Sequence, residues 1–145
     1  MKITNTLPKR NNADSGRKAH NDNIYYKVGR IRMNSWATEV LSAYDIIIYE
    51  SELVHIKNRH GKELQTIGMT AFDFVKFIIS NYNEVRQGTK NTLLLCVHRP
   101  RTSNMAAIEV HQETVENRIV YKINTAAPID TKQLCLKELL CANDH

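Results

Sequence analysis

The chain has 145 residues and a mass of 16.7 kDa, which suits one compact domain and is short for two. With 42% hydrophobic and 24% charged residues, five glycines and three prolines, it is neither collagen-like nor wholly disordered. The longest apolar run, Leu93–Val97, is far below the roughly 20 residues of a membrane helix, and no secretory signal is evident near Met1. We therefore expect a cytoplasmic protein, unless another machine exports it, and no membrane partner.

The charge is unevenly distributed along the chain. Lysine and arginine number 20 against 15 aspartates and glutamates, which gives a net charge of +5. Residues 1–23 hold five basic and two acidic side chains (+3), so residues 24–145 hold 15 and 13 (+2). The first 23 residues have too few large aliphatic side chains to offset the entropy lost on ordering. We predict a flexible basic N-terminal arm, either a solvated tail or a phosphate-attracting segment, followed by a single domain over 24–145.

The cysteines and glycines give no sign of a bound cofactor. Cys96, Cys135 and Cys141 are an odd number without a CxxC pair, so neither a disulfide framework nor a zinc ribbon is indicated. A metal site would have to use pairs such as Cys96 with His98, which lack a matching second pair. Phosphate-loop and dinucleotide-binding signatures are absent from the sequence. We expect no metal and no cofactor.

Two strands and two helices are predicted before residue 90. Alternating side chains in Ile24–Met33 and the β-branched run in Asp45–Glu50 are typical of strands, and Ser35–Ala43 between them could be a short helix. A helix over 51–61 would begin at Ser51 and end at Gly61. The helical spacing of large side chains predicts a second helix over 71–86. Thr70 would be its N-cap, and Gly88 would lie past its end.

The period then changes to that of strands. Three strands are predicted at Thr92–Arg99, Met105–His111 and Arg118–Thr125, followed by a short helix over Lys132–Leu140. Strands joined by short loops form an antiparallel meander. The predicted fold class is α+β, with N-terminal helices packed on an antiparallel meander and the other sheet face open to solvent.

Three functional side chains gather on the first predicted helix. His55 and Arg59 are four residues apart and share a helical face, whereas His60 would join them only if the helix loosens at Gly61. Histidine exchanges protons near neutral pH and arginine donates to phosphate oxygens, so the pair suits acid/base chemistry on a phosphodiester. The alternative is a solvated helix with two incidental histidines.

Two strand regions carry further candidates. In a regular strand Tyr121 and Thr125 share one face, with Lys122 on the other; the phenol and hydroxyl could hold a phosphate, although any strand favours such residues. Arg99 and Arg101 flank Pro100, at what would be a hairpin tip facing phosphate. The alternative is a solvated charge cluster that protects a sheet edge.

The order of these motifs resembles the barnase, EndoU, colicin and RelE-like ribonuclease superfamily, in particular its phage-associated and polymorphic-toxin branches. The resemblance covers about residues 45–140. It rests on the HIxxRH helix that starts at His55, the Asn81–Tyr82 pair closing the second helix, and the strand ending in Thr125 and Ala126. It implies an endoribonuclease, a hydrolase that needs no metal. The ribose 2′-hydroxyl attacks phosphorus and leaves a cyclic phosphate and a 5′-hydroxyl.

The resemblance also implies roles for particular residues. His55 would be the general base or acid and His60 the second histidine of the motif, with Arg59 holding phosphate oxygens. Thr125 with Tyr121 would orient the scissile phosphate. RNA-binding cations would be Arg99, Arg101 and Lys122. The expected partners are RNA, with tRNA as one candidate, and a cognate immunity protein if the chain is a toxin delivered into a target-cell cytoplasm.

The rival interpretation is a non-catalytic RNA- or protein-binding module on the same frame. It is favoured by the net charge of only +2 over residues 24–145, because a nuclease usually has a stronger basic footprint. A phage structural or accessory protein is a third option, since a fold does not determine an activity.

Overall fold

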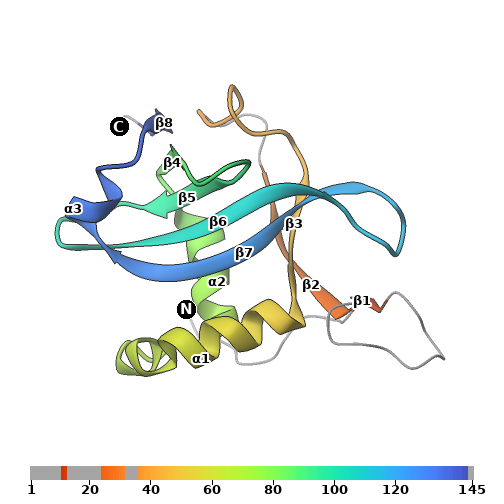
Figure 1. The fold of residues 1–145 in the computed structure, drawn as a ribbon, viewed down its shortest axis with the longest axis horizontal. Coiled ribbons are helices and arrows are strands. Elements are labelled where there is room, and N and C mark those ends of the chain that lie inside the picture. Colours follow the sequence, from red (N-terminus) through yellow and green to blue (C-terminus); the bar gives the residue numbers. More distant parts are fainter. Residues whose placement is uncertain (1–10, 13–23, 32–35, 144–145) are drawn as a thin grey trace.

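The computed structural model describes residues 11–12, 24–31 and 36–143. In that part of the chain eight strands form one sheet in the order β1-β2-β3-β7-β6-β5-β4-β8, with three helices (Figure 1). The strands are β1 (Asn11–Asn12), β2 (Ile24–Arg30), β3 (Asp45–Tyr49), β4 (Glu84–Gln87), β5 (Leu93–Val97), β6 (Thr102–Gln112), β7 (Ile119–Asp130) and β8 (Leu139–Ala142). The helices are α1 (Glu50–Thr66), α2 (Ala71–Asn81) and α3 (Thr131–Leu134). Apart from β1, the predicted basic arm over 1–23 lies outside the described residues.

The predicted fold class is wrong in how helices and strands are arranged. The protein is a mixed α/β structure dominated by its sheet, and α1 and α2 follow β2 and β3 in the chain instead of preceding the sheet. The sheet is not a plain antiparallel meander, because β3 pairs with β7 in parallel through Ile46↔Tyr121 and Ile47↔Lys122. β3 therefore connects β1 and β2 to the strands that follow the helices.

The first long helix runs past its predicted end. α1 continues through Gly61 to Thr66, and its C-cap is Ile67. Gly68 adopts φ +74° and its N–H donates to the Gln65 carbonyl at 3.1 Å. A glycine in this left-handed conformation is a common way to end a helix. Gly61 is an ordinary helical position, so the predicted end was placed at the wrong glycine.

The second helix begins as predicted and ends earlier. Thr70 is its N-cap, and the Thr70 hydroxyl accepts a hydrogen bond from the Asp73 N–H at 3.1 Å. The helix stops at Asn81 because Tyr82 takes an extended conformation (φ −60°, ψ 140°). Glu84–Arg86, predicted as the end of this helix, belongs to strand β4 (Glu84–Gln87), which pairs antiparallel with β5.

The remaining predicted strands are present with different extents, whereas two predicted short helices are wrong. The predicted strands at Ile24–Met33, Asp45–Glu50, Thr92–Arg99, Met105–His111 and Arg118–Thr125 correspond to β2, β3, β5, β6 and β7. Residues 36–40 form hydrogen-bonded turns instead of the predicted short helix. The predicted helix over Lys132–Leu140 is also wrong, because α3 ends at Leu134 and the chain then forms β8 beside β4.

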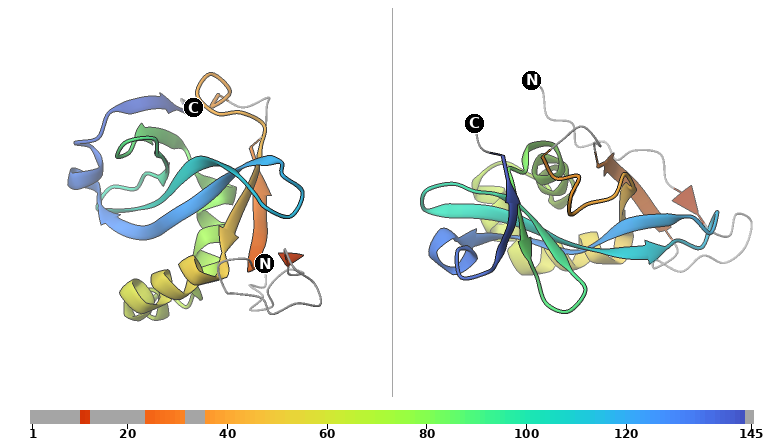
Figure 2. Two further views of the ribbon diagram at one scale, coloured as in Figure 1. Left: turned by 45° about the vertical axis from the view of Figure 1, so that its right-hand side comes forward. Right: turned by 90° about the horizontal axis from the view of Figure 1, so that it is seen from above.

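The sheet has two unlike faces. α1 and α2 cover one face, where the main core contains Tyr26, Ile48, Phe74, Ile108 and Ile123. The other face carries two smaller apolar clusters, one around Tyr25, Ile47 and Val120 and one in which Leu134 of α3 covers Leu94, Cys96 and Ala107. Figure 2 shows the long β6–β7 hairpin running beside the helical layer. None of the helices within the described ranges is long and apolar enough to cross a membrane.

Two glycine substitutions test this packing. A Cβ on Gly29 of β2 would lie 2.6 Å from Cγ2 of Ile79, a buried and branched side chain of α2. We expect Gly29→Ala to destabilise the fold by about 1–3 kcal/mol through overpacking, measured by urea unfolding. Gly61→Ala is the matched control: its Cβ meets nothing closer than 3.9 Å, so it should stabilise α1 by about 0.5–1 kcal/mol. Equal effects of the two variants would contradict this packing.

Candidate functional site

The structure keeps His55 and Arg59 one turn apart on the same side of α1, as predicted, and places His60 on another side. His55 is 62% exposed, and its Nδ1 lies 3.6 Å from Oε2 of Glu52. Arg59 is exposed one turn further along α1. His60 is 24% exposed and its Nδ1 lies 2.9 Å from Oε1 of Glu63. Because the helix does not loosen at Gly61, His55 and His60 point in different directions around its axis.

The predicted pair on β7 is also separated. Tyr121 is 3% exposed, its ring packs on Tyr44 at 5.2 Å, and its hydroxyl accepts a hydrogen bond from the Ser42 N–H at 2.9 Å. A bulge in β7 shifts the register, so that Ile123 pairs with Ile108 and Thr125 pairs with Ala107. Ala107 belongs to the apolar cluster on the face away from α1 and α2. Tyr121 is therefore a core residue, and Thr125 does not share its face.

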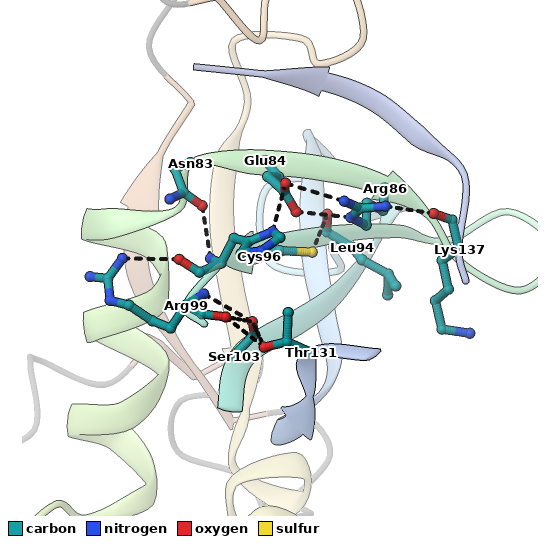
Figure 3. A network of polar contacts seen from close by, with 10 residues as sticks. Asn83, Glu84, Arg86, Leu94, Cys96, Arg99, Ser103, Thr131 and Lys137 are labelled. Carbon is teal, nitrogen blue, oxygen red and sulfur yellow. Dashed lines mark hydrogen bonds and ion pairs between the residues drawn. The ribbon is translucent and has the colours of Figure 1, made fainter. Parts of the chain in front are cut away.

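Arg99 and Arg101 lie in the turn between β5 and β6. Both are exposed, and Nη1 of Arg99 donates to the neighbouring His98 carbonyl at 3.1 Å. In Figure 3 the turn is fastened by Ser103 and Thr131, whose hydroxyl oxygens are 2.6 Å apart. The opposite end of β6 holds the cavity described next, up to about 30 Å away along an extended strand. These two arginines are not brought to that cavity.

A cavity of about 290 Å³ lies where β3, β6, β7 and the start of α1 meet. Tyr49 ends β3, His111 is near the end of β6, and Lys122 and Asn124 project from β7. The lining is completed by Ser51, Glu52 and Thr114. Of the predicted site residues only Lys122 lines this cavity, with Thr125 next to Asn124 in the chain.

The polar groups around this cavity form two sets of contacts. The Tyr49 hydroxyl and Nε2 of His111 are 2.9 Å apart, and the two rings meet edge to face at 5.6 Å. Nδ2 of Asn124 donates to Oε1 of Glu109 at 2.8 Å, and Nζ of Lys122 lies 3.8 Å from the same oxygen. Glu109 and His111 are two residues apart on β6 and so share a face. Imidazole, phenol, ammonium and carboxylate are thus gathered on one sheet face.

The surroundings favour the neutral form of the His111 imidazole. Partial burial lowers the pKa of His111, and the nearby Lys122 ammonium lowers it further, against the opposing effect of Glu109 and Glu113. A neutral imidazole at physiological pH can accept a proton. The cavity therefore holds a proton acceptor next to a cation, an arrangement that can deprotonate a hydroxyl and offset negative charge.

Another polar cluster, around Glu84 and Arg86, is closed and structural. The Arg86 guanidinium holds Glu84 through Nε–Oε1 at 2.8 Å and Nη2–Oε2 at 3.2 Å, and its Nη1 donates to the Lys137 carbonyl at 2.8 Å (Figure 3). Nδ1 of His98 lies 2.9 Å from Oε2 of Glu84. Burial raises the pKa of Glu84, but the hydrogen bonds from Arg86 and His98 outweigh this and lower it overall. The cluster ties β4, β5 and the segment before β8 together.

Sequence reasoning missed Tyr49, His111 and Glu109. The sequence showed that Glu109 and His111 share one face of a predicted strand. Nothing local in the sequence indicated that Tyr49 of β3 would lie beside β6 and β7. The described residues contain no group of three or more histidines, cysteines, aspartates or glutamates that could hold a metal ion. No protein-family model, curated protein or solved structure matches the chain.

Breaking the Glu84–Arg86 pair tests the structural role of the cluster around these two residues. The two side chains are only 12% and 8% exposed, so Arg86→Met should leave a buried carboxylate without its main partner. We expect a loss of about 3–5 kcal/mol in the free energy of unfolding, measured by urea unfolding. The double variant Glu84→Leu/Arg86→Met removes both charges and should lose clearly less. A double variant as unstable as Arg86→Met would contradict this interpretation.

Titration of His111 tests the electrostatics of the cavity. Followed by NMR, the His111 imidazole should titrate below its ordinary pKa of about 6.5. Lys122→Met should raise that pKa because it removes a neighbouring positive charge, whereas Lys132→Met, on α3, should leave it unchanged. A wild-type His111 that titrates at or above the ordinary value would show that the cavity does not favour the neutral imidazole.

Proposed function

We propose that the protein is a metal-independent endoribonuclease that cleaves RNA in the cavity lined by Tyr49, His111 and Lys122. The observation that carries the proposal is the contact of a neutral imidazole with a phenol, beside a lysine, in an open cavity. Such a set supplies a proton acceptor and a charge for a developing phosphorane. The net charge of +5 suits a polyanionic substrate.

In the proposed reaction His111 takes the proton of the ribose 2′-hydroxyl. The O2′–P bond then forms, the P–O5′ bond breaks, and the 5′ oxygen receives a proton, which leaves a 2′,3′-cyclic phosphate and a 5′-hydroxyl. In this proposal the Lys122 ammonium, which lines the cavity, offsets the negative charge that develops on the phosphate oxygens, and the Tyr49 hydroxyl orients the imidazole. The Asn124 amide and the adjacent Thr125 hydroxyl can donate to phosphate oxygens.

His55 is the proposed general acid, which gives a proton to the departing 5′ oxygen. Glu52 lines the cavity and lies 3.6 Å from Nδ1 of His55, so it links that imidazole to the cavity's rim. Arg59 projects one turn further along α1 and is the proposed contact for a neighbouring phosphate. His60 and Tyr121 have no part in this proposal, because His60 pairs with Glu63 and Tyr121 is buried in the core.

The proposed reaction is the one that the resemblance to the barnase, EndoU, colicin and RelE-like superfamily implies. The proposed active site, however, lies on the sheet around His111 instead of on α1. Action in a cytoplasm, on tRNA or another RNA, and restraint by a cognate immunity protein are parts of the same proposal. The second candidate is a non-catalytic RNA-binding module, favoured by the net charge of only +2 over residues 24–145.

RNA cleavage in the presence of EDTA tests the proposal. Purified protein should cleave total tRNA or a synthetic RNA to products with cyclic phosphate ends, and His111→Gln should lower the rate by about 100-fold or more. Lys122→Met and His55→Gln should each slow cleavage, while His60→Gln is the matched control and should leave it unchanged. The rate should rise with pH through the lowered pKa of His111, since only the neutral imidazole accepts a proton.

Two outcomes would contradict the proposal. Intact RNA together with salt-sensitive binding would indicate the non-catalytic module. Cleavage that continues at the wild-type rate in His111→Gln would indicate that the reaction takes place elsewhere. A substrate with 2′-deoxyribose at the cleaved position must also remain intact, because it lacks the attacking hydroxyl.

A further inference from the structure

A groove runs along the flank of α1 that faces the start of α2. It consists of two cavities of about 280 and 470 Å³, and both are lined by Lys57, Thr70 and Ala71, so they are continuous. Six of the nine α1 residues that line it form a stripe with spacings of three and four residues: Val54, Lys57, Asn58, Gly61, Lys62 and Gln65. Such spacing places them in one stripe along the helix.

The floor of this groove is apolar and its rim is positive. Val54 is 46% exposed and Met69 is half-buried, and beneath them lie the buried side chains of Leu53, Phe72 and Leu64. The lysines at positions 57 and 62 are both exposed along the rim. The single acidic side chain among the lining residues, Glu50, accepts a hydrogen bond from Tyr26 at 2.9 Å at one end of the groove. The charge of the rim therefore favours an acidic occupant.

The shape of the groove suits a helix of about three turns. From Val54 to Gln65 the stripe rises through 11 residues, which is about 16 Å along the helix axis. Gly61 lies in the middle of the stripe and has no side chain, so another backbone can come close there. An amphipathic helix presents apolar residues at the same spacing of three and four residues as this stripe.

We propose that this groove is a docking site for an acidic amphipathic helix of another protein. The apolar face of the partner helix contacts Leu53, Val54, Phe72 and Met69, and its acidic side chains contact Lys57 and Lys62. The cavity lined by His111 adjoins the other flank of α1, where Glu52 lies. His55 is seven residues before Lys62 and therefore lies with it on the outer side of the helix, between the two flanks. Partner binding at the groove consequently leaves that cavity open, and the proposal stands independently of the proposed nuclease function.

A pair of designed peptides tests the docking site. The first is a fluorescein-labelled helical peptide of 15 residues, with leucines at i, i+3, i+4 and i+7 flanked by glutamates. The second is the same peptide with lysines in place of the glutamates. We expect the full chain to bind the acidic peptide at least tenfold more tightly in fluorescence anisotropy, with an affinity that falls as salt rises.

Variants of the groove separate docking from non-specific attraction. Lys57→Glu/Lys62→Glu should weaken the acidic peptide at least tenfold, and Gly61→Leu should weaken both peptides by filling the floor. The matched control Lys76→Glu/Lys132→Glu changes the net charge equally outside the groove and should bind like the wild type. Equal affinity for the two peptides, absence of binding, or an equal loss in the control would overturn the proposal. A chain that binds peptide but never cleaves RNA would refute only the nuclease function.

Discussion

The parallel pairing of β3 with β7 is the contact on which the arrangement of this protein depends. Only two residue pairs, Ile46↔Tyr121 and Ile47↔Lys122, join the strands that precede the helices to those that follow them. Ile46, Ile47 and Ile48 are fully buried, so apolar packing on both faces of β3 holds this short junction. The same pairing brings Tyr49, at the end of β3, to His111 of β6. The β3–β7 pairing therefore determines both the order of the strands and the position of Tyr49 in the candidate site.

α1 follows directly from this junction and separates two surfaces of different character. Its Leu53, Ile56 and Leu64 face the core, which sets the orientation of the helix around its axis. One flank then carries Glu52 at the edge of the cavity, and the opposite flank carries Gly61 and Lys57 of the groove. His55 and Lys62 lie between these flanks, on the outer side of the helix.

Local patterns predicted the local structure well and the pairing of distant elements poorly. Thr70 was recognisable as an N-cap because its neighbours continue with helical spacing, and the strands from Leu93 onward alternate clearly. Gly61 was mistaken for a helix end since a glycine's φ is not visible in sequence, and Gly68 has that role. Glu84–Arg86 continued the helical pattern of α2 in the sequence, but in the structure these residues form hydrogen-bonded pairs with β5 and β8.

The candidate site was predicted only in part for the same reason. Lys122 was identified from its strand, but Tyr121 and Thr125 were assigned one face because a β-bulge leaves no mark in the alternation of this segment. The HIxxRH pattern favoured a site on α1. His111 lies in a strand with no such pattern, and its pKa is lowered by burial and by Lys122, which only the folded structure shows. Contacts between residues as far apart as 49 and 111 are set by topology.

The most direct test of this account is the proximity of Tyr49 and His111 in solution. Nuclear Overhauser effects should connect the Tyr49 ring protons to the His111 imidazole protons, together with cross-strand effects between residues 46–47 and 121–122 in the parallel pattern. Their absence in a folded protein, or antiparallel contacts between β3 and β7, would contradict both the fold and the site built on it.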